Sequence, residues 1–166
     1  MKTPQGNRYQ TGTKRLLAAI IDGLVFIPLL LMEDWIAKNA ALSIAVGSII
    51  IMALLPLVYS IFLHYRYGQT LGKWMVGVKV LDSTETRRLT LKQSVFRDSF
   101  FLIIEIVTLV YFLFQANKLN YLEDGYNDFA AQPVFWWTIV ELETMLTNKK
   151  RRSIHDWLAR SVVVRL

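Results

Sequence analysis

Residues 41–65 read ALSIAVGSIIIMALLPLVYSIFLHY, an apolar run of 25 residues that carries no formal charge. At a rise of 1.5 Å per residue, a helix of this length exceeds the roughly 30 Å hydrocarbon core of a bilayer, which needs about 20 apolar residues. The whole 166-residue chain is biased in the same direction, with 54% hydrophobic residues, 19% charged residues and a mean hydropathy of +0.34. Because soluble domains average about a quarter charged residues, this composition predicts an integral membrane protein.

Two further segments have the composition of membrane spans. Residues 16–32 contain one charge, Asp22, and residues 99–115 contain one charge, Glu105. Each is about as long as the shortest apolar helix that crosses a bilayer, roughly 17 residues. No small-x-small cleavage site follows Met32, so we expect the first segment to be a retained span rather than a signal peptide.

A fourth segment, residues 134–148, is ambiguous because it carries Glu141 and Glu143. On hydropathy alone it fits an interfacial amphipathic helix as well as a span. The distribution of basic residues favours a span. The polar segments 1–15, 33–40, 66–98, 116–133 and 149–166 contain 4, 1, 7, 1 and 6 of the 19 Lys and Arg residues.

Since Lys and Arg concentrate on the cytoplasmic side of a membrane protein, this alternation requires an even number of crossings. The sequence therefore predicts one domain, residues 1–166, folded as an all-α membrane protein. We expect a four-transmembrane-helix bundle that passes the cell membrane several times and has both termini in the cytoplasm. Its spans are predicted at about 15–32, 41–65, 97–115 and 133–148. Topology and anionic headgroups then account for the net charge of +6, and no nucleic-acid partner is expected.

The cytoplasmic segments carry a β pattern. Residues 74–81 are rich in β-branched side chains and are bounded by Gly72 and Asp82, as a strand would be. Residues 161–166 have a similar composition, and residues 89–91 are a candidate return strand. We expect these pieces to form a small cytoplasmic sheet or hairpin at the membrane surface.

Several motifs in chain order resemble the RDD family of small bacterial integral membrane proteins, which is named after one arginine and two aspartates. The matching elements are Arg15 followed by Asp22, the stretch GQTLGKWMVGVKV at residues 68–80, Arg97, and the segment from Ile154 through His155 and Asp156 to Val163. The resemblance makes Asp156 the second aspartate of the signature. It implies transport of a poorly defined ligand, with ion–proton antiport proposed for some members. Arg160 stands where the family often has glycine, so this turn is expected to differ locally.

Counting residues from the predicted cytoplasmic end of each span places three acids at one depth. Asp22, Glu105 and Glu141 lie roughly 9–11 Å below the boundary, and Tyr59 and Ser60 fall at about the same depth. Ionisable residues at bilayer depth usually face the bundle interior and carry function. Three neighbouring carboxylates cannot all stay ionised unless a bound cation or an arginine neutralises them. Otherwise some of them take up protons. These five residues therefore form the predicted cation- or proton-binding site.

Arginine supplies the structural alternative. In that interpretation Arg15 and Arg97 reach inward and pair with Asp22 and Glu105, so that the acids only hold helices together. If the acids do bind a cation, the same two arginines would tune the pKa values of the carboxylates.

The two histidines have structural interpretations. His155 and Asp156 are expected to anchor the C-terminal segment, with Asp156 paired to Arg97 or to another cytoplasmic arginine. His64 is expected to be an interfacial anchor rather than a proton relay. The histidines are 91 residues apart and the chain has no cysteine, so no metal site is predicted.

The leading function hypothesis is transport or exchange of a small monovalent cation, coupled to protons, by a chain that needs a homo-oligomer because four spans form a narrow bundle. The alternative is a non-transporting scaffold or accessory subunit, whose cytoplasmic basic face binds a protein partner or anionic lipid. The sequence contains no recognisable set of nucleophile, base and orienting residue, so neither an enzyme nor a cofactor is predicted.

Overall fold

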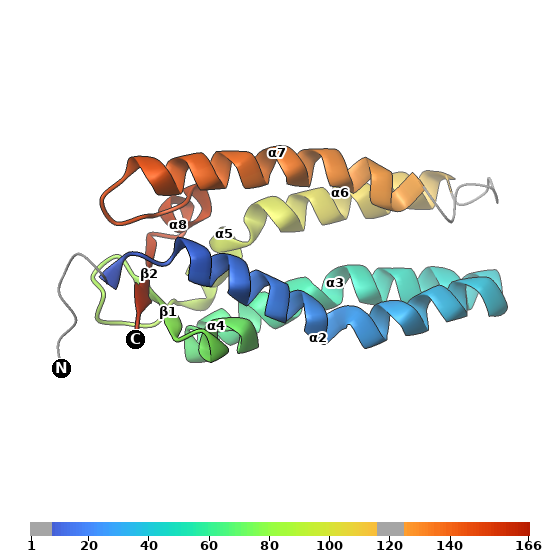
Figure 1. The fold of residues 1–166 in the computed structure, drawn as a ribbon. Coiled ribbons are helices and arrows are strands. Elements are labelled where there is room, and N and C mark those ends of the chain that lie inside the picture. The colour runs from blue at the N-terminus through green and yellow to red at the C-terminus, as the bar shows by residue number, and fades with distance from the viewer. Residues whose placement is uncertain (1–7, 116–124) are drawn as a thin grey trace.

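The computed structural model describes residues 8–115 and 125–166, and four long helices dominate it. Helix α2 packs on α3, α6 packs on α7, and α3 also contacts α6. Figure 1 shows these as two helical hairpins running alongside each other. The four helices are α2 (Gly12–Asn39), α3 (Leu42–Tyr67), α6 (Ser99–Gln115) and α7 (Gly125–Thr147).

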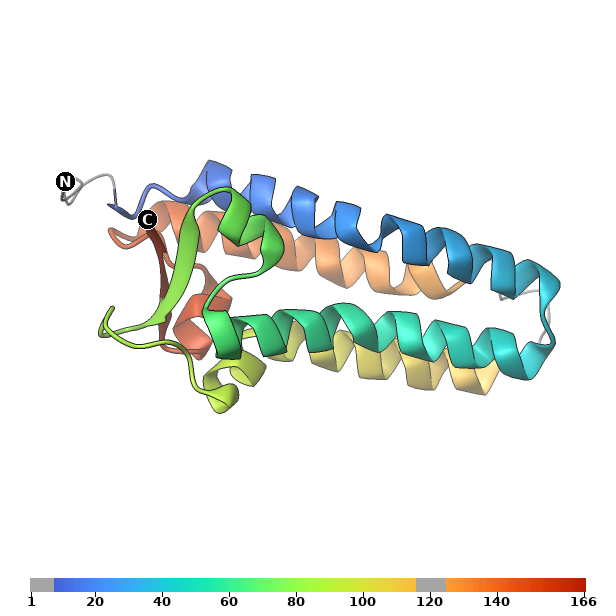
Figure 2. The ribbon, with the colours of Figure 1, turned by 90° about the horizontal axis from the view of Figure 1, so that it is seen from below.

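The short elements gather at one end of the bundle, which we call the base (Figure 2). The start of α2 and the C-terminal strand β2 also lie at the base (Figure 1), where Arg8 pairs with Glu85. The elements of the base are α4 (Leu71–Met75), β1 (Val78–Asp82), α5 (Leu91–Arg97), α8 (Ile154–Leu158) and β2 (Ser161–Arg165).

The predicted β element is present as a two-stranded antiparallel sheet of β1 and β2, with Val80 opposite Val163. The strand predicted at residues 74–81 begins only at Val78, because Thr70 caps the short helix α4 that includes residues 74 and 75. Val78, Val80 and Val163 are fully buried and pack with Leu89 into a small apolar core. The return strand predicted at residues 89–91 is wrong. Thr90 instead forms a capping box with Gln93 and starts α5, because its hydroxyl accepts the free N–H of the first helical turn.

The exterior of the bundle is apolar. Leu31, Ile51 and Phe114 are 67%, 60% and 82% exposed, whereas Asp156 and Ser153 at the base are fully buried. This arrangement is the inverse of that of a soluble protein, in which large apolar patches are rarely left in contact with water.

Two helical segments, Gly12–Ile36 and Ser43–Tyr67, are long and apolar enough to cross a membrane. Only 6% and 17% of their most apolar windows are buried, which distinguishes them from core helices of soluble proteins. The apolar part of α6, Ser99–Tyr111, is shorter. The all-α membrane class predicted from sequence is therefore supported, whereas the count of four spans and their orientation belong to the proposal below.

Gly68 and Gly72 bring the chain back against the bundle after α3. Gly68 ends α3 in the left-handed region, with φ of 73°, which glycine adopts without a steric penalty. Gly72 lies so close to α2 that a Cβ atom there would be 2.1 Å from the backbone oxygen of Ala18. This close approach fixes α4 beside α2.

We predict that Gly72→Ala lowers the thermal unfolding midpoint in detergent, by an amount equivalent to about 1–3 kcal/mol, because α4 must move away from α2. Gly47→Ala on α3 is the control, since a Cβ atom there meets nothing within 4 Å. That control should be neutral or stabilise the helix by at most about 1 kcal/mol. Equal midpoints for the two variants would contradict the close packing at Gly72.

Candidate functional site

A cavity of about 540 Å³ lies at the base between the long helices. Its lining includes Asp22 on α2, Tyr59 and Ser60 on α3, and Glu141 on α7. Four of the five residues of the predicted binding site therefore line one cavity. The fifth, Glu105, is half-buried on α6 and is not among the residues that line it.

Asp22 is held by three donors. Its Oδ1 accepts hydrogen bonds from the hydroxyl of Tyr59 and the backbone N–H of Gly72, both at 2.8 Å. Its Oδ2 accepts from the hydroxyl of Thr70 at 2.5 Å. Thr70 is also the N-cap residue of α4. Asp22 thus joins α2 to α3 and to the start of α4, and none of its three donors carries a charge.

Glu141 faces the C-terminal segment. Its Oε1 contacts Nδ1 of His155 and accepts a hydrogen bond from the indole Nε1 of Trp137 at 2.8 Å. Trp137 in turn stacks on Phe100 of α6, with ring centroids 3.8 Å apart. In the part of the chain that the structure describes, Oε2 of Glu141 has no hydrogen-bond partner.

Asp156 is the centre of the ionic network. Its Oδ2 lies 2.7 Å from Nη1 of Arg15, and its Oδ1 lies 2.8 Å from Nη1 of Arg97. The Asp156 side chain is fully buried, and those of Arg15 and Arg97 are 10% and 4% exposed. The structural alternative expected Arg15 on Asp22 and Arg97 on Glu105, but both guanidinium groups are found on Asp156.

Further hydrogen bonds are donated to both carboxylate oxygens of Asp156. Ser153 donates both its backbone N–H and its hydroxyl to Oδ2, and Ser161 donates its hydroxyl to Oδ1. Burial by itself would raise the pKa of Asp156, but the two guanidinium groups outweigh it and hold the pKa well below its usual range. Asp156 is therefore an anion at every physiological pH and acts as a structural counter-ion.

A second series of hydrogen-bonded polar side chains was not predicted from the sequence. Nζ of Lys73, on α4, lies 2.6 Å from Nε2 of His64, and Nδ1 of His64 lies 2.8 Å from the backbone oxygen of Ser60. Ser60 donates its hydroxyl to Oδ2 of Asp98 at 2.9 Å. His64 is 1% exposed, so its predicted role as an interfacial anchor is wrong. The turn at Gly68, which returns α4 to α3, creates this contact.

Lys73 lines the cavity and has an unusual environment. Burial of its amine is the main cause, and the Arg97 guanidinium the second, of a pKa lowered from 10.5 to about 7. Asp98 and Asp22 act in the opposite direction without cancelling these effects.

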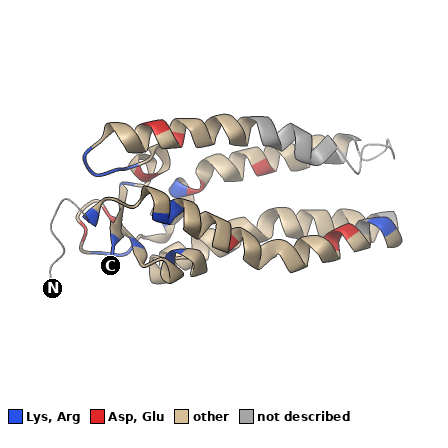
Figure 3. Cartoon of the chain, in the orientation of Figure 1, with Lys and Arg blue, Asp and Glu red and all other residues tan. Residues whose placement is uncertain are grey.

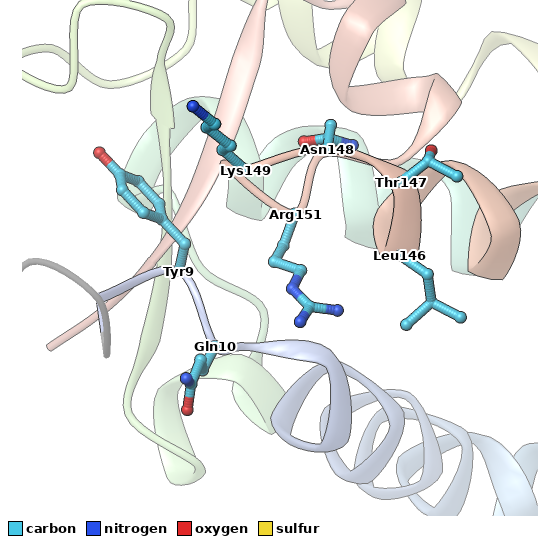
Figure 4. Close-up of a pocket in the computed structure, with 7 residues that line it drawn as sticks. All are labelled: Tyr9, Gln10, Leu146, Thr147, Asn148, Lys149 and Arg151. Carbon is cyan, nitrogen blue, oxygen red and sulfur yellow. The ribbon is translucent and has the colours of Figure 1, made fainter.

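A shallower pocket of about 390 Å³ lies at the surface of the base, where the loop after α7 passes the start of α2. Figure 4 shows the Arg151 side chain extending between Gln10 and Leu146, whereas Lys149 points away from them. The intervening Lys150 pairs with Glu85 at 2.7 Å. This pocket is basic, open and separate from the acids predicted as a binding site.

The candidate site contains acids and bases but no metal-binding cluster. Among residues 8–115 and 125–166, no three His, Asp or Glu side chains converge as a metal ion would require. The lining of the cavity therefore brings carboxylate and hydroxyl oxygens together with the amine of Lys73 and two guanidinium groups.

We predict that Asp156→Asn destabilises the protein by about 3–5 kcal/mol, because it leaves two buried arginines without a counter-charge. Asp34→Asn is the matched control, since Asp34 pairs with Lys38 while both side chains are more than half exposed. Loss of such a surface pair should change stability by less than about 1 kcal/mol. Equilibrium unfolding in mixed micelles measures both, and equal effects would contradict the network.

A family comparison agrees with the positions of these residues. The model of the RDD family matches residues 9–160, which includes Arg15, Asp22 and Asp156. No curated protein and no solved structure matches the chain. Together with the apolar exterior of α2 and α3, the match points to a membrane protein. The chain belongs to the RDD family.

Proposed function

We propose that the protein exchanges a small monovalent cation for a proton at the base cavity. The observation that carries this proposal is the placement of Asp22 and Glu141 on one cavity inside a bundle whose exterior is apolar. Carboxylates at bilayer depth are costly unless they serve as structural partners or bind a substrate. No catalytic activity and no cofactor form part of the proposal.

The ligand oxygens available to a cation can be counted. A carboxylate offers about four lone-pair positions. Asp22 uses three of them on Tyr59, Thr70 and Gly72, which leaves one. Glu141 contributes its second oxygen, and Tyr59 and Ser60 contribute hydroxyl groups. Glu105 is left out of the proposed site because it does not line the cavity.

The proposed topology places the base in the cytoplasm. Figure 3 shows most Lys and Arg residues of the described chain at the base, whereas Lys38 lies near the opposite end of α2. Positive charge is retained on the cytoplasmic side, so α2, α3, α6 and α7 would each cross the membrane once. Both ends of the chain would then be cytoplasmic. A bundle of four helices is narrow, so the proposal includes a homo-oligomer as the transporting unit.

Because the chain has no cysteine, single cysteines can test this topology without background. We predict that an impermeant maleimide labels Asn39→Cys on intact cells. Ser83→Cys, in the base, and Lys149→Cys, after α7, should react only after permeabilisation. Labelling of Lys149→Cys on intact cells would contradict the passage of α7 through the membrane.

We predict that purified protein in proteoliposomes dissipates a pH gradient when a monovalent cation gradient is applied. Asp22→Asn and Glu141→Gln should reduce this flux to the level of empty liposomes, because each removes an anionic ligand. Glu143→Gln, an exposed position on the same helix, is the control and should keep the flux. Equal flux in all four proteins would contradict the proposed site.

A scaffold or accessory subunit is the second candidate, and the exposed basic pocket beside Arg151 favours it. In that case the acids of the cavity would only join helices, and the base would bind anionic lipid or a protein partner. The wild-type protein would then carry no flux with any cation, and Asp22→Asn would lower the unfolding midpoint instead.

A further inference from the structure

We infer that Lys73 is the group of the base cavity that takes up and releases the proton, with His64 holding its amine in place. This inference rests on the proposed exchange and names the proton-carrying residue within it. It assigns to an amine the role that the sequence had led us to expect of carboxylates.

The hydrogen-bond geometry determines which partner donates. The backbone oxygen of Ser60 only accepts, so Nδ1 of His64 carries a proton and donates it. In a neutral ring Nε2 is then an acceptor, and the amine of Lys73 donates to it at 2.6 Å. Lys73 keeps this donor bond whether it is an ammonium or a neutral amine. A change of its charge therefore requires no rearrangement of His64.

The aspartates near the cavity each have direct partners. Asp156 is held as an anion by two guanidinium groups, and Asp22 accepts hydrogen bonds from three uncharged donors. Asp98 accepts from Ser60. In contrast, no carboxylate oxygen lies within 4 Å of the Lys73 amine among the described residues. Lys73 is thus the cationic side chain of the cavity that lacks a direct counter-ion.

Charged groups from several elements surround Lys73. Arg15 and Asp22 face it from α2, His64 from α3, Arg97 from α5, and Asp98 from the end of α5. Strand β1 contributes Lys79, whose side-chain carbons approach Gly68, and Glu141 and His155 line the same cavity. Burial and the two arginines disfavour the ammonium form, and the two aspartates favour it. These opposing effects place the pKa of Lys73 at about 7.

The position of Lys73 in the cavity would couple cation binding to proton release. An ammonium group in the cavity repels a second cation, whereas a neutral amine leaves Asp22 and Glu141 free to bind one. Entry of the cation would therefore drive the proton from Lys73 to solvent, and return of the proton would expel the cation. One charge replaces another, and no bond other than N–H is broken or formed.

The test is an NMR titration of lysine side chains in the purified full-length protein, labelled at Cε and Nζ, between pH 5 and 11. One lysine should titrate near pH 7, and that signal should be absent in Lys73→Arg. If every lysine titrates near its ordinary value of about 10.4, or if the neutral signal persists in Lys73→Arg, the inference is overturned. The first of these outcomes needs no variant to fold.

Flux measurements separate this inference from the proposed function. Lys73→Gln and Lys73→Arg should each abolish the dependence of cation flux on a pH gradient, because neither side chain changes charge near neutral pH. Lys92→Gln, an exposed position on α5, should retain it. Proton-coupled flux that persists in both Lys73 variants overturns the inference and leaves the exchange proposal standing. A wild-type protein without flux, but with Lys73 titrating near pH 7, removes the exchange proposal and supports the proton site.

Discussion

The carboxylate of Asp156 holds two guanidinium groups that come from parts of the chain far apart in sequence, Arg15 on α2 and Arg97 on α5. Each ion by itself would be costly to bury, by several kcal/mol, so both guanidinium groups depend on the Asp156 carboxylate for their burial. The contact fixes the start of α2, the entry to α6 and the C-terminal segment as one unit. The walls of the base cavity depend on that assembly.

The rest of the base follows from a second constraint, the return of the chain after α3. Gly68 permits the reversal, Gly72 permits contact with α2, and Asp22 accepts the backbone N–H of Gly72. The polar side chains that this turn brings in, Thr70 and Lys73, line a cavity inside a bundle whose exterior is apolar. They must satisfy each other or bind something, which explains why donors and acceptors are so densely paired around Asp22.

The depth of a residue along a single helix could be predicted from the sequence. A rise of 1.5 Å per residue predicted that Asp22, Glu141, Tyr59 and Ser60 lie at one level, and these four residues line one cavity. The same count included Glu105, which does not line it. The resemblance to the family also led to the expected pairing of Asp156 with Arg97, which the structure confirms. Contacts that depend on the turn after α3 could not be predicted. Lys73 was seen only as part of a glycine-rich segment, and its approach to His64 depends on the left-handed residue at Gly68. The short helix α5 was missed because seven residues show little periodicity, although the pair Thr90 and Gln93 gave a capping signal.

A double-mutant cycle on Arg15 and Asp156 tests the central claim most directly. The free energy of unfolding is measured in mixed micelles for the wild type, Arg15→Met, Asp156→Asn and the double variant. If the two residues form a buried ion pair, the sum of the two single-variant changes in unfolding free energy should differ from that of the double variant by about 1–3 kcal/mol. Effects that add to within about 0.5 kcal/mol would show that the two residues do not interact, and the assembly of the base would need another explanation.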